Sequence, residues 1–199
     1  MKDFWNKRYS EDNLAYGEFP NDFLNENLSY IPECGKVLCI AEGQGRNALF
    51  LARQGFQVTA VDYSEVGIKK IQEQARDQNL KLKTFIADLK DFDFGIEKWD
   101  GVISIFCHLP SSLRKEVHQR ITPSLTSTGV LLLEAYTPKQ LDFNTGGPKD
   151  PDMFYSSSIL AQDFPDLKIL SNQECIREIH EGIYHQGMSA VVQLIATKK

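Results

Sequence analysis

The sequence predicts an α/β fold built on a doubly wound, mostly parallel sheet of seven strands, and three observations support this class. Apolar runs typical of strands alternate with helical segments through the middle of the chain. The continuous apolar run over 130–136 suits the centre of a parallel sheet, whose two faces are covered by helices. The last two apolar segments follow one another with no helix between them, so they pair antiparallel and make the last strand antiparallel.

Seven segments carry a strand signal, either a short apolar run or an alternation of apolar and polar residues. They are residues 36–41, 56–62, 80–88, 99–106, 130–136, 167–180 and 189–197. Glu134 lies inside the apolar fifth segment, and a buried carboxylate needs a partner. We therefore expect a structural ion pair at Glu134.

Helical segments separate the first five strands. Residues 47–54 are predicted to be helical, and Gly55 is placed to end that helix. Ser64 can cap the next helix. Residues 110–121 predict a third helix with Pro110 at its first position, where proline is favoured.

The pattern of the chain changes after the fifth strand. Residues 137–157 are rich in Gly, Pro, Asp and Asn, which predicts a long loop or lid, and such loops are often functional. A short helix over 157–164 then precedes the last two strands. The chain of 199 residues is long enough for one sizeable core, so we expect a single domain over 1–199.

Composition and charge exclude several classes of protein. Hydrophobic residues make up 42% of the chain and charged residues 25%, and the formal net charge of −5 argues against a nucleic-acid partner. No apolar run approaches the roughly 18 residues of a membrane span, and the N-terminal residues lack the apolar region of a signal peptide. We expect a cytoplasmic protein with neither a membrane nor a nucleic acid as partner.

A glycine turn follows the first predicted strand. Gly43 and Gly45 let the backbone turn sharply and let a ligand approach closely, because they have no Cβ atom. In open α/β sheets, ligands bind beyond the carboxyl ends of the strands, where the strand order reverses. Asp62 ends the second strand, 17 residues after Gly45 (62 minus 45), and its carboxylate can accept hydrogen bonds from both hydroxyls of a ribose.

Two classes of ligand fit this turn. Residues 43–48 read GQGRNA and match G-x-G-x-x-A, so a nicotinamide or flavin dinucleotide is one alternative. The pyrophosphate of such a ligand needs a helix N-terminus free of negative charge, but Glu42 stands immediately ahead of the glycines. S-adenosylmethionine carries a sulfonium and an ammonium group and no phosphate. A carboxylate at position 42 therefore favours S-adenosylmethionine.

The chain resembles the class I S-adenosylmethionine-dependent methyltransferases, in particular the small group similar to tellurite-resistance and thiopurine methyltransferases. The segments that carry the resemblance are VLCIAEGQGRNALFLARQGFQVTAVDYS (37–64), FIADLKDF (85–92), WDGVISIFCHLP (99–110), GVLLLEAYTP (129–138), YGEFPNDFL (16–24) and HEGIYHQG (180–187). The resemblance implies a Rossmann-like methyltransferase fold with S-adenosylmethionine as the cofactor. It also implies that residues 1–30 form a cover over the site, with 137–157 as the loop or lid.

This sequence departs from the family pattern at the glycine turn. The family's loop usually opens with an acidic residue and a glycine, where this chain has Cys39 and Ala41. The glutamate stands later, as Glu42. The contacts to the amino-acid end of the cofactor are therefore expected to differ from the family pattern.

The resemblance implies roles for residues at the ends of the second, third and fourth strands. Asp62 should hold the ribose while Tyr63 packs on the adenine face, and replacing Asp62 is expected to weaken cofactor binding with little effect on stability. Asp88 should take the adenine amino group beside the Leu89 backbone. The full set of expected cofactor-binding residues is Glu42, Gly43, Gly45, Arg46, Asp62, Tyr63, Asp88, Leu89, Ile105 and Phe106.

Four residues are candidates for the chemistry: His108, His180, His185 and Tyr16. His108 follows the fourth strand, where the transferred methyl group should lie, and an ordinary histidine pKa near 6.5 lets it act as a base or as an anion-binding cation. The spacing of His180-Glu181-x-x-x-His185 is one residue longer than the helical zinc motif H-E-x-x-H, and glycines flank it. No metal site is expected.

The predicted function is methyl transfer from S-adenosylmethionine to a small-molecule acceptor. A small-molecule oxygen or nitrogen acceptor stays open, and the resemblance favours a thiol or a chalcogen oxyanion. Such soft nucleophiles need little help from a base, so the enzyme mainly holds the reacting atoms in line and dry. Two alternatives stay open from the sequence. One is a non-catalytic S-adenosylmethionine-binding domain of the same fold, and the other is a small NAD(P)-binding oxidoreductase.

Overall fold

The computed structural model describes residues 2–10 and 14–199. Four residues of the predicted cover, at positions 1 and 11–13, lie outside the described residues. The strands are β1 (Lys36–Ile40), β2 (Gln57–Asp62), β3 (Lys83–Ile86), β4 (Trp99–Ile105), β5 (Leu125–Tyr136), β6 (Leu167–His180) and β7 (Gln186–Lys198). The helices are α1 (Lys2–Tyr9), α2 (Asp22–Glu26), α3 (Arg46–Arg53), α4 (Glu65–Asp77), α5 (Ser111–Ser124) and α6 (Ser157–Asp163), with short 3-10 helices at Leu28–Tyr30, Pro138–Asp142 and Pro151–Met153.

The seven strands form one sheet in the order β3-β2-β1-β4-β5-β7-β6. The pairs from β3 to β5 are parallel, and β7 is antiparallel to both of its neighbours, β5 and β6. The predicted fold class, with seven strands and an antiparallel last strand, is therefore confirmed. The antiparallel strand does not form the edge, because β7 inserts between β5 and β6.

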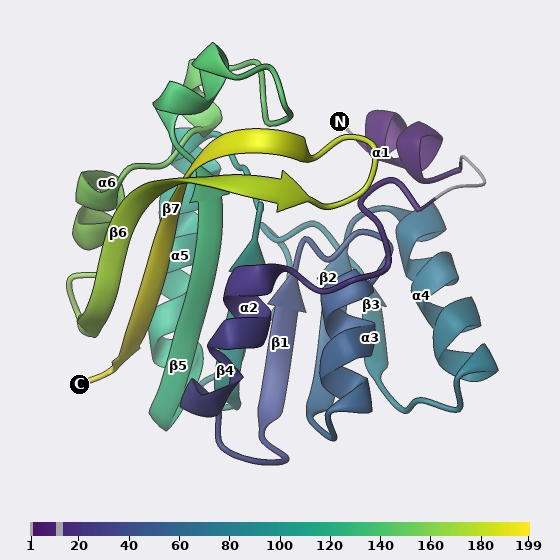
Figure 1. Cartoon of the computed structure of the whole chain (residues 1–199). Helices are drawn as coiled ribbons and strands as arrows, with labels where there is room; N and C mark the ends of the chain where they lie inside the picture. The colour runs from purple at the N-terminus through teal and green to yellow at the C-terminus, as the bar shows by residue number, and fades with distance from the viewer. Residues whose placement is uncertain (1, 11–13) are drawn as a thin grey trace.

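Helices cover both faces of the sheet (Figure 1). Apolar side chains of α2, α3 and α4 form one core with one face of β1, β2 and β4, as shown by Leu24, Leu51 and Ile71, which are fully buried. Residues of α5 and α6 form the core on the other face, where Ile121 and Leu160 are fully buried. This alternation of faces explains why the central strands are apolar throughout.

Three local predictions need correction. No helix connects β3 to β4, and residues 87–98 form turns that bury Leu89, Phe92 and Phe94 instead. Pro110 is the N-cap of α5 rather than its first helical residue, because its ψ of 146° is extended. The fifth strand begins at Leu125, five residues before the predicted start at 130, because residues 125–129 are also extended.

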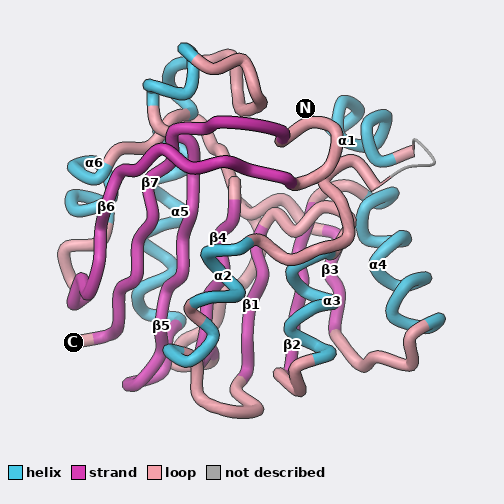
Figure 2. Tube along the Cα trace, in the orientation of Figure 1, coloured by secondary structure: helices cyan, strands magenta, loops and turns pink. Residues whose placement is uncertain are grey.

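The carboxyl ends of β1, β2 and β4 meet at one edge of the sheet. The strand order reverses between β1 and β4, so this edge is where a ligand of an open α/β sheet binds. Figure 1 shows α1 and the loop that joins β6 to β7 lying over this edge, toward which the parallel arrowheads point. In Figure 2 the last part of β6 and the first part of β7 run side by side across the same edge.

Candidate cofactor and acceptor site

The glycine turn needs glycine at both positions. Gly43 and Gly45 have φ angles of 62° and 92°, in the left-handed region. A Cβ atom at Gly43 would lie 2.7 Å from the hydroxyl of Tyr9, and one at Gly45 would lie 2.6 Å from Ile71 Cγ1. Ala41 also has a positive φ, of 50°, so the position that departs from the family pattern holds strained backbone at the turn.

Glu42 caps the helix that follows the turn. Its Oε1 accepts hydrogen bonds from the backbone N–H groups of Asn47 and Ala48, at 3.0 and 2.8 Å. These first N–H groups of α3 are the ones that would bind a pyrophosphate. Since a carboxylate of the chain already takes them, the turn is unsuited to a dinucleotide. The G-x-G-x-x-A match at residues 43–48 thus lacks the free helix N-terminus that gives the motif its function.

Glu42 is also poised to respond to a cation. Its burial raises its pKa to about 7, although the hydrogen bonds from Ala48 and Asn47 and the charge of Arg46 lower it. A sulfonium or ammonium group placed near the carboxylate would favour the ionised form and lower this pKa. Binding of a cationic ligand would then release a proton from Glu42 near neutral pH.

Affinity for S-adenosylmethionine should therefore weaken as the pH falls from 8 to 6. Below the pKa of about 7 the free protein holds a proton on Glu42 that the ligand must displace. The loss approaches but does not exceed about tenfold per pH unit, the limit for one linked proton. Calorimetric titration of the wild type and of Glu42→Gln measures it. The variant should show a flatter dependence, and identical profiles for the two proteins would contradict a contact between Glu42 and the cation.

Asp62 fixes the turn from the end of β2. Its Oδ2 accepts the N–H of Gly43 and its Oδ1 accepts the N–H of Ser64, both at 2.8 Å. Asp62 is only 5% exposed, and its burial raises its pKa, which the three backbone hydrogen bonds to its carboxylate oppose. Each carboxylate oxygen can accept a further hydrogen bond, so the geometry is compatible with a ribose. The expectation that Asp62 matters little for stability is unsupported, because two buried N–H groups depend on it.

A hollow of about 420 Å³ lies at the carboxyl ends of β2 and β3, next in the chain to Asp62. Its walls are Lys2, Tyr63, Ile86, Ala87 and Asp88. The hollow brings together an aromatic ring and an exposed carboxylate, as the adenine of S-adenosylmethionine requires. The residues therefore fit the nucleoside part of this cofactor.

Two further predicted residues lie deeper in the structure. Leu89 is 6% exposed and belongs to the core, and its carbonyl accepts a hydrogen bond from Arg120. Ile105 is 8% exposed and packs in the opposite core. Phe106 is half-buried and has a φ of 52°, so strained backbone occurs at the ends of both β1 and β4.

Four aromatic side chains gather beyond the ends of β4 and β5. The ring of His185 lies 4.5 Å from that of Tyr16, 4.7 Å from that of Phe106 and 5.3 Å from that of Tyr136, measured between centroids. We refer to Tyr16, Phe106, Tyr136 and His185 as the aromatic cluster. The structure thus brings two of the four catalytic candidates, Tyr16 and His185, into direct contact across the chain.

The aromatic cluster contains two buried polar atoms without a hydrogen-bond partner. Among the described residues, none hydrogen-bonds to Tyr136 Oη or to His185 Nδ1. Nδ1 of His185 lies 3.9 Å from Glu181 Oε2, beyond hydrogen-bonding distance. Buried polar atoms without partners are uncommon, and a bound ligand is one explanation for them. Burial also lowers the pKa of His185, although its neighbour Glu181 raises it.

His108 packs beside the aromatic cluster with both nitrogens engaged. Its Nδ1 lies 2.8 Å from the carbonyl oxygen of Met153, so this nitrogen carries the proton and donates it. Its Nε2 accepts the backbone N–H of Tyr136 at 3.3 Å. Burial lowers the pKa of His108 to about 4, so the ring is neutral at pH 7. This environment disfavours an anion-binding cation and leaves no free nitrogen for a base.

His180 is separate from the other candidates. Its side chain is 62% exposed, and its Nδ1 is hydrogen-bonded to Gln186 Nε2 at 2.7 Å. No group of three or more His, Cys, Asp or Glu side chains in residues 2–10 and 14–199 is arranged to hold a metal ion.

A network of buried polar side chains around Glu134 lies next to the aromatic cluster, which it reaches through Glu181. Glu134 is fully buried and is bonded to Arg177 Nη2 at 2.7 Å, to Asn21 Nδ2 at 2.7 Å and to Gln193 Nε2 at 2.5 Å. The predicted ion pair at Glu134 is therefore confirmed, with Arg177 as its partner. No local sequence pattern indicates this pairing, because 43 residues separate the two charges.

Arg46 belongs to the same network. Its Nη2 lies 2.5 Å from Glu181 Oε2, and Asn21 and Arg177 bind the other oxygen of Glu181. Burial opposes ionisation of Glu181, but Arg46 and the neighbouring His185 together outweigh it and hold the pKa of Glu181 well below its usual range. Arg46 was expected to contact the cofactor. In the structure its guanidinium instead joins α3 to the loop between β6 and β7.

The N-terminal segment and two loops close over the site. Asn6 of α1 accepts a hydrogen bond from Ser64 Oγ at 2.7 Å, and a Cβ atom at Gly182 would lie 2.5 Å from the backbone nitrogen of Gly17. The loop at 137–157 also reaches the cluster, because a Cβ atom at Gly146 would lie 3.1 Å from Tyr136 Oη. The N-terminal segment therefore contacts the start of α4 and the loop between β6 and β7, and the loop at 137–157 contacts the aromatic cluster.

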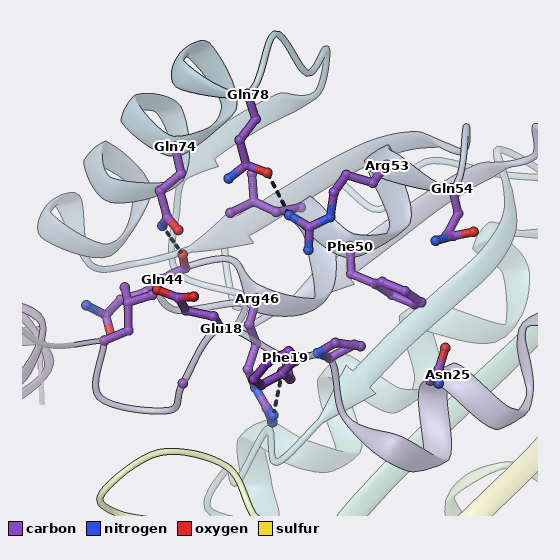
Figure 3. A pocket seen from close by; sticks show the side chains of 14 residues that line it. Glu18, Phe19, Asn25, Gln44, Arg46, Phe50, Arg53, Gln54, Gln74 and Gln78 are labelled. Carbon is purple, nitrogen blue, oxygen red and sulfur yellow. Dashed lines mark hydrogen bonds between the residues drawn. The ribbon is translucent and has the colours of Figure 1, made fainter.

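A second hollow lies outside this site. It measures about 590 Å³ and is formed by residues 14–20, α2, α3 and α4 (Figure 3). In Figure 3 the side chain of Arg53, from α3, meets that of Gln78, with a hydrogen bond of 2.6 Å between them. Of the predicted site residues, only Arg46 lines this hollow. It is formed by helices and the N-terminal segment rather than by strand ends.

The fold and the site together define a class of protein: a Rossmann-like domain with a glycine turn after its first strand, a buried carboxylate at the end of its second strand and a hollow at the ends of β2 and β3. Residues 37–129 match the family model described as a methyltransferase domain. These findings confirm the resemblance to the class I S-adenosylmethionine-dependent methyltransferases and S-adenosylmethionine as the cofactor.

Two known methyltransferases are similar in sequence to about half of this chain. The chain is 29% identical over 103 residues to the probable S-adenosyl-L-methionine-dependent methyltransferase TehB of Haemophilus influenzae, covering 52% of this chain and 33% of that protein. It is 30% identical over 112 residues to a putative methyltransferase of a Geobacillus species, covering 54% of this chain and 44% of that protein. The matched region therefore spans less than half of either relative.

Solved structures share the fold over the whole chain. The structure of TehB from Haemophilus influenzae has a TM-score of 0.71 at 21% identity and covers 100% of this chain and 67% of that one. A structure described under "Conversion of a Disulfide Bond into a Thioacetal Group during Echinomycin Biosynthesis" has a TM-score of 0.81 at 18% identity, covering 100% of this chain and 92% of that one. No helix in the described part of the chain is long and apolar enough to cross a membrane.

Proposed function

We propose that this chain is an enzyme that transfers a methyl group from S-adenosylmethionine to a small-molecule acceptor, either a thiol or a chalcogen oxyanion. The observation that carries the ligand class is the carboxylate of Glu42 on the first N–H groups of α3. It occupies the position a pyrophosphate needs and offers negative charge to a sulfonium. We place the enzyme in the cytoplasm as a single domain, with 1–30 as its cover and 137–157 as its lid.

The chain's residues would hold the cofactor in two parts. Asp62 would accept the ribose hydroxyls, and the hollow between Tyr63 and Asp88 would hold the adenine. When bound, the cofactor supplies a methyl group on a positively charged sulfur that leaves as a neutral thioether. The protein's part is to align the acceptor with this methyl group and to exclude water, and alignment alone can lower the barrier by about 7–11 kcal/mol.

The aromatic cluster is the proposed acceptor site. It lies beyond the ends of β4 and β5, and two of its buried polar atoms, Tyr136 Oη and His185 Nδ1, have no hydrogen-bond partner among the described residues. Burial lowers the pKa of His185, so its ring is neutral near pH 7 and can accept a proton or a hydrogen bond. A soft nucleophile needs no stronger base, which favours a thiol or a chalcogen oxyanion. We keep Tyr16 as the residue that closes the cluster.

Replacing His185 by phenylalanine should slow methyl transfer by roughly 10- to 100-fold, at or below the lower end for a positioned acid–base group. The ring stays in the cluster while Nδ1 is lost. Affinity for S-adenosylhomocysteine should stay unchanged. The measurement is turnover on a small thiol and on selenite, with calorimetry for the product.

The exposed His180 provides the matched control for this prediction. His180→Phe should keep full turnover, because the side chain lies in solvent away from the cluster. Equal turnover of the two variants would remove His185 from the acceptor site. Absence of any transfer by the wild type, with normal binding of S-adenosylhomocysteine, would favour the alternative of a non-catalytic cofactor-binding domain.

A further inference from the structure

Arg8 is a cation of α1 that has no acidic partner among residues 2–10 and 14–199. Its Nη1 donates a hydrogen bond to Tyr16 Oη at 2.9 Å. Its guanidinium carbon lies 4.0 Å from the ring centroid of Tyr184 and 4.6 Å from that of Phe4. In residues 2–10 and 14–199, no carboxylate lies within 4.0 Å of this side chain. A guanidinium has five N–H donors, so most of its donors stay available.

The other arginines around the site are already neutralised. Arg46 is paired with Glu181, and Arg177 is paired with Glu134 and Glu181. Two half-buried cations thus face two buried carboxylates. Arg8 has no such carboxylate partner among the described residues. The side chain is half-buried against aromatic rings, which keeps the guanidinium weakly hydrated and holds it in place.

The position of Arg8 lies between the two halves of the site. Its neighbour Tyr9 packs on Gly43 of the glycine turn, with the hydroxyl 2.7 Å from where a Cβ atom would be. Its hydrogen-bond partner Tyr16 packs on His185 of the aromatic cluster. Through Tyr9 and Tyr16, Arg8 is therefore linked both to the glycine turn and to the aromatic cluster.

We propose that Arg8 binds the carboxylate at the amino-acid end of S-adenosylmethionine. The inference rests on the proposed function. That end of the cofactor is a zwitterion, and the chain offers an anion at Glu42 and an unpaired cation at Arg8. A guanidinium binds a carboxylate with two parallel hydrogen bonds, which fixes orientation as well as charge.

An anionic methyl acceptor could also bind the Arg8 guanidinium. The test must therefore distinguish the carboxylate of the cofactor from the acceptor. S-adenosylhomocysteine carries the amino-acid end, whereas 5′-methylthioadenosine has the same nucleoside without it. We expect Arg8→Gln to weaken binding of S-adenosylhomocysteine by about 10- to 100-fold, the range for hydrogen bonds to a charged group. Binding of methylthioadenosine should change by less than about twofold, since the nucleoside contacts are intact.

Lys7→Gln is the matched control, because Lys7 is an exposed cation on the same helix. It should leave both affinities unchanged. Equal weakening of both ligands by Arg8→Gln would overturn the proposal, since Arg8 would then act through the cover. Unchanged affinity for S-adenosylhomocysteine with a raised KM for selenite would overturn it in favour of the acceptor. Failure of the wild type to bind S-adenosylhomocysteine at all would contradict the proposed function itself.

Discussion

Replacing Glu134 by alanine is expected to lower the free energy of unfolding by about 3–5 kcal/mol, the cost of breaking a buried ion pair. The fully buried carboxylate accepts hydrogen bonds from Arg177, Asn21 and Gln193. Its removal leaves the Arg177 guanidinium, whose side chain is only 16% exposed, with less negative charge around it. Chemical denaturation followed by tryptophan fluorescence measures the difference.

Asp22 supplies the control for this prediction on the same arginine. Its carboxylate lies 3.2 Å from Arg177 Nη1, but the side chain is 68% exposed. Exposed ion pairs contribute about 0–1 kcal/mol, so Asp22→Ala should cost less than about 1 kcal/mol. If Glu134→Ala lowers the free energy of unfolding no more than Asp22→Ala does, the ion pair between Glu134 and Arg177 does not act as a buried ion pair.

Replacing Asp62 by alanine is expected to weaken binding of S-adenosylhomocysteine by about 2–3 kcal/mol, the scale of hydrogen bonds to a charged group. The same change should also destabilise the free protein. The N–H groups of Gly43 and Ser64 would lose their acceptor, and each buried N–H left unpaired costs about 1–3 kcal/mol. Calorimetric titration and chemical denaturation give the two quantities on the same preparation.

Asp100 separates the two effects of the Asp62 change. It also accepts a backbone hydrogen bond, from the N–H of Lys36 at 2.8 Å, but it lies at the start of β4 and away from the carboxyl ends of the strands. Asp100→Ala should destabilise the protein without changing affinity for S-adenosylhomocysteine. Equal affinity of Asp62→Ala and the wild type would leave the ribose without its proposed partner.

The elements that position the site were predictable because their signals are local. A parallel strand buried on both faces must be apolar throughout, as in 130–136, and a turn with left-handed backbone selects glycine, as at Gly43 and Gly45. Ser64 caps α4 as its residue type predicts, with its Oγ accepting the N–H of Gly67 at 3.1 Å. Local rules of this kind need no knowledge of the distant chain.

The properties that depend on distant contacts were not predictable. The neutral state of His108 comes from its burial and from the carbonyl of Met153, 45 residues away. The pairing of Arg46 depends on Glu181, 135 residues away. The connection between β3 and β4 was also beyond a local rule, since its apolar residues pack into the core without forming a helix.

Calorimetric titration with S-adenosylhomocysteine and with NAD in parallel tests most directly whether the site binds S-adenosylmethionine and excludes dinucleotides. The carboxylate of Glu42 on the N-terminus of α3, together with Asp62 and the hollow beside it, predicts saturable binding of S-adenosylhomocysteine at a single site and no heat from NAD. Saturable binding of NAD, with none of S-adenosylhomocysteine, would contradict the account.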